Sequence, residues 1–161
     1  MSKVLVAGVG NIFLGDDGFG VEVARRLAAK PLPAYVHVQD FGIRGIHLAY
    51  QLLEGYDLLI IVDALPFGAA PGTLCVMEPE RDGDGHDDVP SDAHTMNPQS
   101  VLSMVSALGG RIDRVLVVGC EPQDSVERIG LSESVSRAVD EAVRLISDLL
   151  MREISTRAEI N

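Results

Sequence analysis

The segment VAGVGNIFLGDDGFGVEVARRL, residues 6–27, decides the fold because it joins an apolar strand to a helix through a glycine-rich turn. The run KVLVAGV at 3–9 is typical of a strand that is buried on both faces of a sheet. Residues 19–30 carry apolar side chains near helical spacing and end before Pro31, which cannot continue a helix. A buried strand that leads into a helix is the repeating unit of a parallel sheet.

The same alternation of strands and helices continues through the rest of the chain. It predicts an α/β fold with three layers, α/β/α, in which helices cover both faces of a mostly parallel, twisted sheet of about five strands. The length favours a single domain over 1–161, with a polar C-terminal tail from about residue 152 that is expected to fray. Further strands are expected over 35–40, 57–64, 72–78 and 114–120, the third of them near an edge, and helices over 46–55, 97–108 and 131–150.

The composition excludes several classes of partner. The net charge is −11, so binding to nucleic acid or to an anionic membrane is disfavoured. Over half of that charge lies in the segment 78–92, which holds seven acidic residues and one arginine and is expected to form a solvated loop. The cysteines, Cys75 and Cys120, are too far apart in sequence for a CxxC pair, and no apolar run is long enough to span a membrane. These features predict a soluble, cytoplasmic protein.

The glycines after the first strand do not make a good phosphate-binding loop. Gly8 and Gly10 match the start of the dinucleotide fingerprint GxGxxG, but Phe13 stands where the third glycine belongs. The acids Asp16 and Asp17 would repel a pyrophosphate at the helix N-terminus. Nucleotide binding is therefore not favoured.

The acids themselves are the stronger candidates for function. In open parallel sheets the site lies at the carboxyl ends of the strands, where Asp16, Asp17 and Asp63 are expected. His94 lies in a loop that could reach the same edge. Two carboxylates and one imidazole suit a divalent ion such as Zn²⁺ or Ni²⁺. Simpler alternatives remain open: the acids could cap helices, and His94 could be an exposed loop residue.

Several motifs, in this order along the chain, resemble those of one family. The chain is similar to the [NiFe]-hydrogenase maturation endopeptidases, a group of hydrogenase maturation proteases, and the resemblance extends over nearly its whole length. The motifs that carry it are GVGN (8–11), DDGFGV (16–21), DFGIRG (40–45), LLIIVDA (58–64), PGT (71–73), His94, VVGCEP (117–122) and IGLS (129–132).

The resemblance implies an aspartic-type endopeptidase that removes the C-terminal extension of the hydrogenase large-subunit precursor after nickel insertion. Asp17, Asp63 and His94 match the residues that detect the nickel, an ion carried by the substrate for which Zn²⁺ or Cd²⁺ could substitute in a crystal. Asp17 and Asp63 are the expected catalytic residues, with water activated either by the metal or by a carboxylate. The protein is expected to be a monomer and to use no organic cofactor. Asp16 is then expected to be a helix cap or a support for Asp17. Gly42 and Gly45 are expected to shape the wall of the site, or simply to form a tight turn.

Three other hypotheses remain open from the residues alone. A receiver-type signalling module also has paired acids after its first strand, but here they lie seven or eight residues beyond Val9 and no lysine ends the strand at 114–119. A cysteine hydrolase could use Cys120, although a free cysteine in a strand is more often a small buried residue. The third is a metal-binding protein without catalytic activity.

Overall fold

A five-stranded sheet forms the centre of the computed structural model, which describes residues 3–79 and 98–160, the last seven of these only as helical backbone. The strand order is β2-β1-β3-β5-β4. The first four of these strands are mutually parallel, and the edge strand β4 runs antiparallel to β5. The mostly parallel sheet and the edge position of 72–78 are thus confirmed. The strands span Val4–Val9 (β1), Val36–Gly42 (β2), Leu58–Ala64 (β3), Leu74–Met77 (β4) and Arg114–Cys120 (β5).

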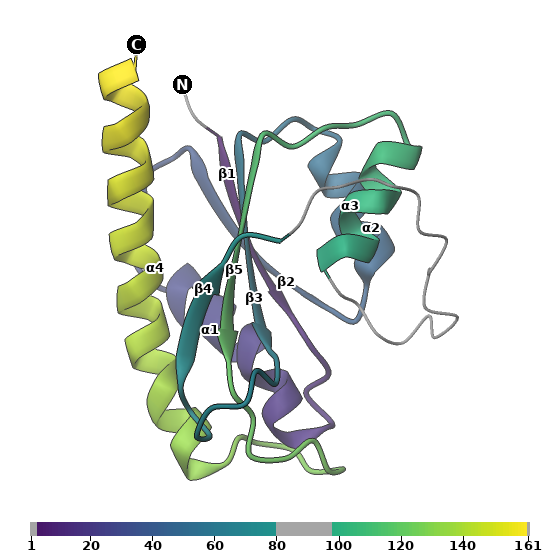
Figure 1. Ribbon diagram of the computed structural model, residues 1–161, viewed down its shortest axis with the longest axis vertical. Coiled ribbons are helices and arrows are strands. Elements are labelled where there is room, and N and C mark those ends of the chain that lie inside the picture. The colour runs from purple at the N-terminus through teal and green to yellow at the C-terminus, as the bar shows by residue number, and fades with distance from the viewer. Residues whose placement is uncertain (1–2, 80–97, 161) are drawn as a thin grey trace.

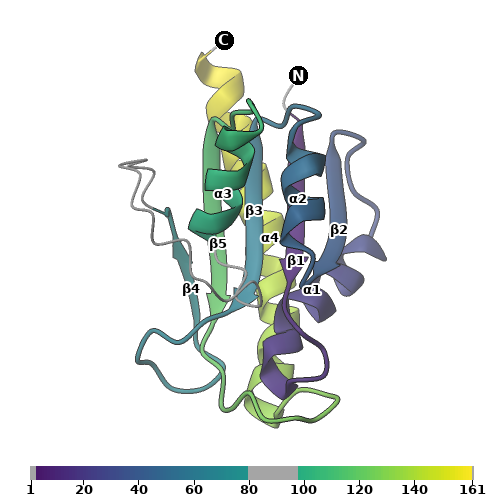
Figure 2. The ribbon, with the colours of Figure 1, turned by 90° about the vertical axis from the view of Figure 1, so that its right-hand side faces the viewer.

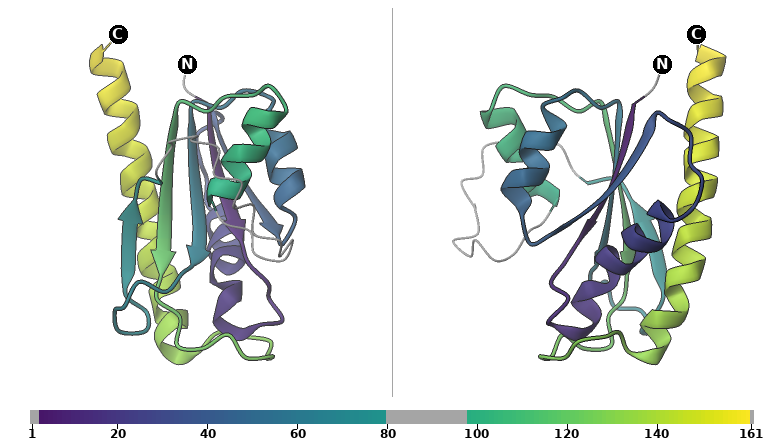
Figure 3. Two further views of the ribbon diagram at one scale, coloured as in Figure 1. Left: turned by 45° about the vertical axis from the view of Figure 1, so that its right-hand side comes forward. Right: turned by 180° about the vertical axis from the view of Figure 1, so that it is seen from behind.

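Helices cover both faces of the sheet, as the sequence predicted. In Figures 1 and 3, α1 and α4 lie on one side of the sheet and α2 and α3 lie on the other. Figure 2 looks onto the side that α2 and α3 cover. The helices span Phe19–Ala28 (α1), Gly45–Leu52 (α2), Pro98–Ala107 (α3) and Glu133–Ile160 (α4), and a 3₁₀ helix, η1, spans Gly15–Gly18.

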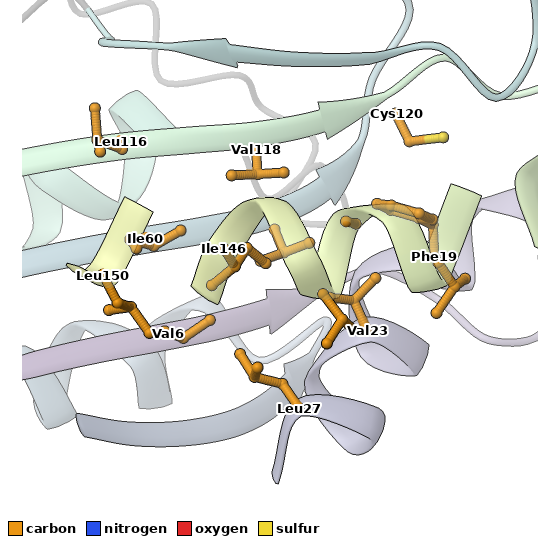
Figure 4. Close-up of a cluster of buried hydrophobic side chains, with 14 of the residues drawn as sticks. Val6, Phe19, Val23, Leu27, Ile60, Leu116, Val118, Cys120, Ile146 and Leu150 are labelled. Atoms are coloured by element: carbon orange, nitrogen blue, oxygen red, sulfur yellow. The ribbon is translucent and has the colours of Figure 1, made fainter. Parts of the chain in front are cut away.

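The alternation of side chains along each central strand divides the core into two apolar clusters. Val4 and Val6 of β1 pack toward α1 and α4, whereas Leu5 and Ala7 pack toward α2 and α3. Figure 4 shows the first cluster, where side chains of three neighbouring strands meet those of α1 and α4. Because these strands are buried on both faces, their sequences are continuous apolar runs.

Two glycines allow α1 to pack directly against the sheet. A Cβ atom at Gly20 would lie 2.0 Å from the carbonyl oxygen of Val62 and 2.5 Å from that of Val9. A Cβ atom at Gly8 would lie 2.3 Å from the carbonyl oxygen of Gly20. Backbone therefore contacts backbone here, and the N-terminus of α1 is fixed at the carboxyl ends of β1 and β3.

One local prediction was wrong, and one of the two roles expected for Asp16 is excluded. The last helix continues to Ile160, well past its predicted end at residue 150, so the tail that was expected to fray is helical. Asp16 does not cap α1, because it lies inside η1 and the N-cap position is Gly18, which makes no side-chain hydrogen bond. No helix in the described part of the chain is long and apolar enough to cross a membrane.

Candidate functional site

The carboxyl edge of the sheet brings Asp17 and Asp63 together, as the sequence predicted. Asp63 lies near the end of β3, opposite Gly119 of β5, and Asp17 lies in η1, which contacts β3. Burial raises the pKa of the Asp63 carboxyl well above its usual value, and the negative charge of Asp17 raises it further. The two carboxylates are therefore close enough to interact.

Asp17 is held by the turn that follows β1. Its Oδ2 atom accepts a hydrogen bond of 2.8 Å from the backbone N–H of Asn11, and its own N–H donates to the carbonyl of Leu14. The backbone of Gly10 approaches so closely that a Cβ atom there would lie 1.9 Å from the carbonyl oxygen of Asp17. Gly10 in turn donates to the carbonyl of Gly42, whose positive φ of 57° makes the turn after β2. The glycines thus shape this turn.

Asp16 has a different role from its neighbour Asp17. Its side chain is fully buried, and both carboxylate oxygens accept hydrogen bonds from the segment between β5 and α4. The donors are the N–H of Gln123 at 2.8 Å, the N–H of Asp124 at 3.4 Å, and both the N–H and the hydroxyl of Ser132 at 2.7 and 2.8 Å. Burial alone would raise the pKa of Asp16, but these hydrogen bonds outweigh it and hold the pKa below its usual value.

Arg128 completes the surroundings of Asp16. Its Nη2 atom lies 3.8 Å from Asp16 Oδ1, and its Nη1 atom lies 3.1 Å from Asp124 Oδ1. The backbone of Arg128 also exchanges hydrogen bonds with Phe13 and Gly15. The turn that carries Asp17 is therefore joined by both side chains and backbone to the segment before α4.

Glu121 is a residue of the site that the sequence analysis did not identify. It follows β5 directly and is buried, and its Oε1 atom accepts hydrogen bonds of 2.9 and 2.8 Å from the N–H groups of Phe67 and Ala69. These bonds hold the pKa of Glu121 below its usual value. Its position after a buried strand at the carboxyl edge is the same signal that identified Asp63, and it could have been found in the same way.

Two of the predicted features lie outside the described residues. His94 and most of the acidic segment fall within 80–97, so the structure places two of the three predicted metal ligands. Within the ranges 3–79 and 98–153, where side chains are described, no group of three His, Cys, Asp or Glu side chains could hold a metal ion.

Cys120 is not suited to be a nucleophile. It is fully buried at the end of β5, and burial together with nearby acidic groups raises the pKa of its thiol to about 12. The thiolate is the reactive form, and it is therefore scarce at neutral pH. The buried-residue interpretation of Cys120 is favoured over a cysteine hydrolase.

The fold is that of an α/β protein, and its candidate site has paired carboxylates at the carboxyl edge of parallel strands. A family model described as hydrogenase maturation protease matches residues 21–149. The chain therefore belongs to the hydrogenase maturation protease family, and its general activity is that of a maturation peptidase. The family also removes the support for a receiver-type signalling module.

Individual relatives agree with this family. The chain is 35% identical over 155 residues to the hydrogenase expression/formation protein HupD of Rhodobacter capsulatus, an alignment that covers 88% of this chain and 70% of the relative. The structure is similar to the hydrogenase maturating endopeptidase HybD of E. coli, with a TM-score of 0.77, 29% identity, and coverage of 94% and 93% of the two chains. It is also similar to a hydrogenase 2 maturation peptidase of a Thaumarchaeota archaeon, with a TM-score of 0.72, 34% identity, and coverage of 92% and 98%.

Proposed function

We propose that this protein removes the C-terminal extension of a [NiFe]-hydrogenase large-subunit precursor after nickel has been inserted. Asp17, Asp63 and His94 recognise the nickel that the substrate carries. The observation that carries the proposal is the position of Asp17 in η1 beside Asp63 at the end of β3. Burial raises the pKa of Asp63, and the negative charge of Asp17 raises it further. Two like charges at one site repel each other, and a cation between them removes that cost.

The chemistry of the donors fits an ion that the substrate delivers. Two carboxylates and an imidazole suit a borderline divalent ion such as Ni²⁺ and leave coordination positions for ligands from elsewhere. In this proposal the remaining ligands belong to the precursor, so the ion joins substrate and enzyme. Empty precursor lacks that binding energy and is cleaved poorly.

The surface around the carboxylates suits a protein substrate. Phe13 is 61% exposed and Ile129 is 75% exposed, although both lie in segments that are joined by backbone hydrogen bonds. Phe67 and Val126, in loops that also follow the carboxyl ends of strands, are exposed as well. In this proposal these exposed apolar side chains contact the precursor.

The cleavage itself requires an activated water. The water oxygen attacks the carbonyl carbon of the scissile peptide bond, the C–N bond breaks, and the leaving nitrogen takes up a proton. The bound ion could polarise that carbonyl, and Asp17 or Asp63 could accept the proton from water. Asp63 stays protonated to a higher pH than an ordinary aspartate, and a neighbouring cation would shift it toward the ionised form that can act as ligand or base.

The proposal is tested by intact mass spectrometry of a nickel-loaded precursor that is incubated with the purified protein. We expect the loss of a C-terminal peptide with wild type, and no such loss with Asp17→Asn or His94→Ala. The control is Asp140→Asn, which makes the same Asp-to-Asn change at an exposed position. Asp140 lies on α4 and forms an ion pair with Arg26 of α1. Full cleavage by both site variants would contradict the proposed roles, whereas an intact precursor with wild type would contradict the proposed function.

A further inference from the structure

Two buried carboxylates have no part in the proposed ligand set. Within 3–79 and 98–153, where side chains are described, the buried polar or charged residues are Asp16 and Glu121. Both lie at the carboxyl edge of the sheet. Each joins one of the two site carboxylates to the same stretch of chain, residues 121–132, which we call the bracing segment.

Asp16 joins the bracing segment to Asp17. Asp16 is the residue before Asp17 in η1, and its side chain accepts hydrogen bonds from Gln123, Asp124 and Ser132. Charged acceptors form stronger hydrogen bonds than neutral ones, so these contacts hold η1 firmly. The backbone bonds of Gly15 and Phe13 to Arg128 restrain the same turn at two further points.

Glu121 joins the bracing segment to the chain that follows Asp63. Its Oε1 atom accepts both N–H bonds from Phe67 and Ala69, shortly after the end of β3. The N–H of Leu65 donates to the carbonyl of Cys120 at 3.0 Å, which restrains the same turn. The chain on the C-terminal side of Asp63 is therefore fixed against the start of the bracing segment.

The hydrogen bonds of Asp16 and Glu121 restrain the backbone on which Asp17 and Asp63 are placed. Asp17 and Asp63 repel each other when both are ionised, and mobile loops would let them separate. Holding both backbones keeps the two carboxylates at a fixed separation before the substrate arrives, which lowers the reorganisation needed for reaction.

We propose that Asp16 and Glu121 are positioning residues that set the separation of Asp17 and Asp63 through the bracing segment. The inference rests on the proposed function, because it concerns the same pair of carboxylates. It differs from a general role in folding in a way that can be measured. A positioning role predicts a loss of turnover in enzyme that is fully folded.

Glu121 offers the sharper test because Oε1 alone accepts the two N–H bonds. Glu121→Gln keeps that oxygen acceptor, whereas Glu121→Met has a similar length and no acceptor. We expect Glu121→Gln to keep kcat within about twofold, and Glu121→Met to lower kcat by at least about tenfold with a much smaller change in KM. Asp16→Asn should resemble Glu121→Met, because backbone N–H groups face both oxygens of Asp16, so the amide nitrogen would meet an N–H donor in either orientation.

The control is Tyr56→Phe, which removes a buried hydroxyl bonded to Gln51 before β3 begins, at the opposite end of that strand from Asp63. Its kcat should equal that of wild type. All variants are compared at a temperature where circular dichroism shows each one fully folded. If Glu121→Met does not fold, Glu121→Asp replaces it, since it keeps the charge but is one methylene too short.

Each outcome is decisive. Wild type that does not cleave the nickel-loaded precursor contradicts the proposed function. Active wild type with a strong loss in Glu121→Met, recovery in Glu121→Gln and no loss in Tyr56→Phe supports the positioning role. Active wild type with unchanged kcat in folded Glu121→Met, or with equal losses in Glu121→Met and Glu121→Gln, overturns the inference.

Discussion

Replacing Asp16 by asparagine should destabilise the protein far more than a surface substitution. The side chain is fully buried, and the change keeps its shape but removes its charge and turns one oxygen into an NH₂ group. Oδ2 accepts from Gln123, Asp124 and the hydroxyl of Ser132, whereas Oδ1 accepts from the N–H of Ser132. In the less costly orientation, the asparagine oxygen replaces Oδ2 and its nitrogen faces the N–H of Ser132.

The magnitude follows from these contacts. The variant loses one hydrogen bond to a charged group, which contributes about 1.5–3 kcal/mol, and leaves buried donors without an acceptor at a cost of about 1–3 kcal/mol. We therefore expect Asp16→Asn to lower the free energy of unfolding by about 3–5 kcal/mol. For a chain of this length, each kcal/mol corresponds to a fall in Tm of about 2–4 °C.

The assay is urea unfolding of the isolated protein at pH 7 in the presence of a chelator, followed by circular dichroism. Asp140→Asn is the matched control, because the same chemical change at an exposed carboxylate removes only a surface ion pair with Arg26 and should alter the free energy of unfolding by no more than about 1 kcal/mol. If Asp16→Asn were as stable as this control, the bracing role of the buried carboxylate would be refuted.

Four further predictions rest on the same structure. Asp63→Asn should abolish cleavage but increase the free energy of unfolding at neutral pH. In the wild type the folded-state pKa of Asp63 is raised above its ordinary value of 3.8, so the protein loses about 1.4 kcal/mol of stability per pH unit between the unfolded and folded pKa values. Unfolding curves at pH 4 and pH 7 measure the gain in stability, and an equal gain at both pH values would contradict the prediction. Asp16 has the opposite sign, because its lowered pKa gives stability that is present above pH 3.8 and is lost as the pH falls through the folded value. Gly20→Ala should lower the free energy of unfolding by about 3 kcal/mol or more, because its Cβ atom would lie 2.0 Å from a backbone oxygen, and near-native stability would show that α1 can move away. Iodoacetamide should label Cys120 only after unfolding and should leave cleavage intact, since the thiol is buried with a pKa of about 12, and rapid inhibition through this residue would reopen the cysteine mechanism.

The sequence was sufficient to predict the architecture because the central strands are buried on both faces. The apolar runs at 3–9 and 57–64 have few alternatives, and the helices between them carry the apolar stripes that such a sheet requires. The rule that sites lie at the carboxyl ends of parallel strands then placed Asp17 and Asp63 together. Both steps depend on local patterns, which a sequence displays directly.

Glu121 could have been found from its position after β5, but the contacts of Asp16 and Glu121 could not be predicted because they join distant segments. Asp16 meets Ser132 across more than a hundred residues of sequence, and nothing near either residue indicates that contact. The same holds for Gly20, whose importance comes from the backbone of Val62. The predicted helix ended too early for a different reason. Residues 151–160 contain no glycine or proline to end α4, but their polar composition favoured a tail that frays.

The most direct test of the central claim is the dependence of cleavage on the nickel that the substrate carries. A large-subunit precursor is purified without nickel and divided, nickel is restored to one half, and both halves are incubated with this protein and followed by intact mass spectrometry. We predict that only the nickel-loaded precursor loses its C-terminal peptide, and that Asp17→Asn abolishes this loss. Cleavage of the empty precursor at the same rate would contradict recognition through the metal.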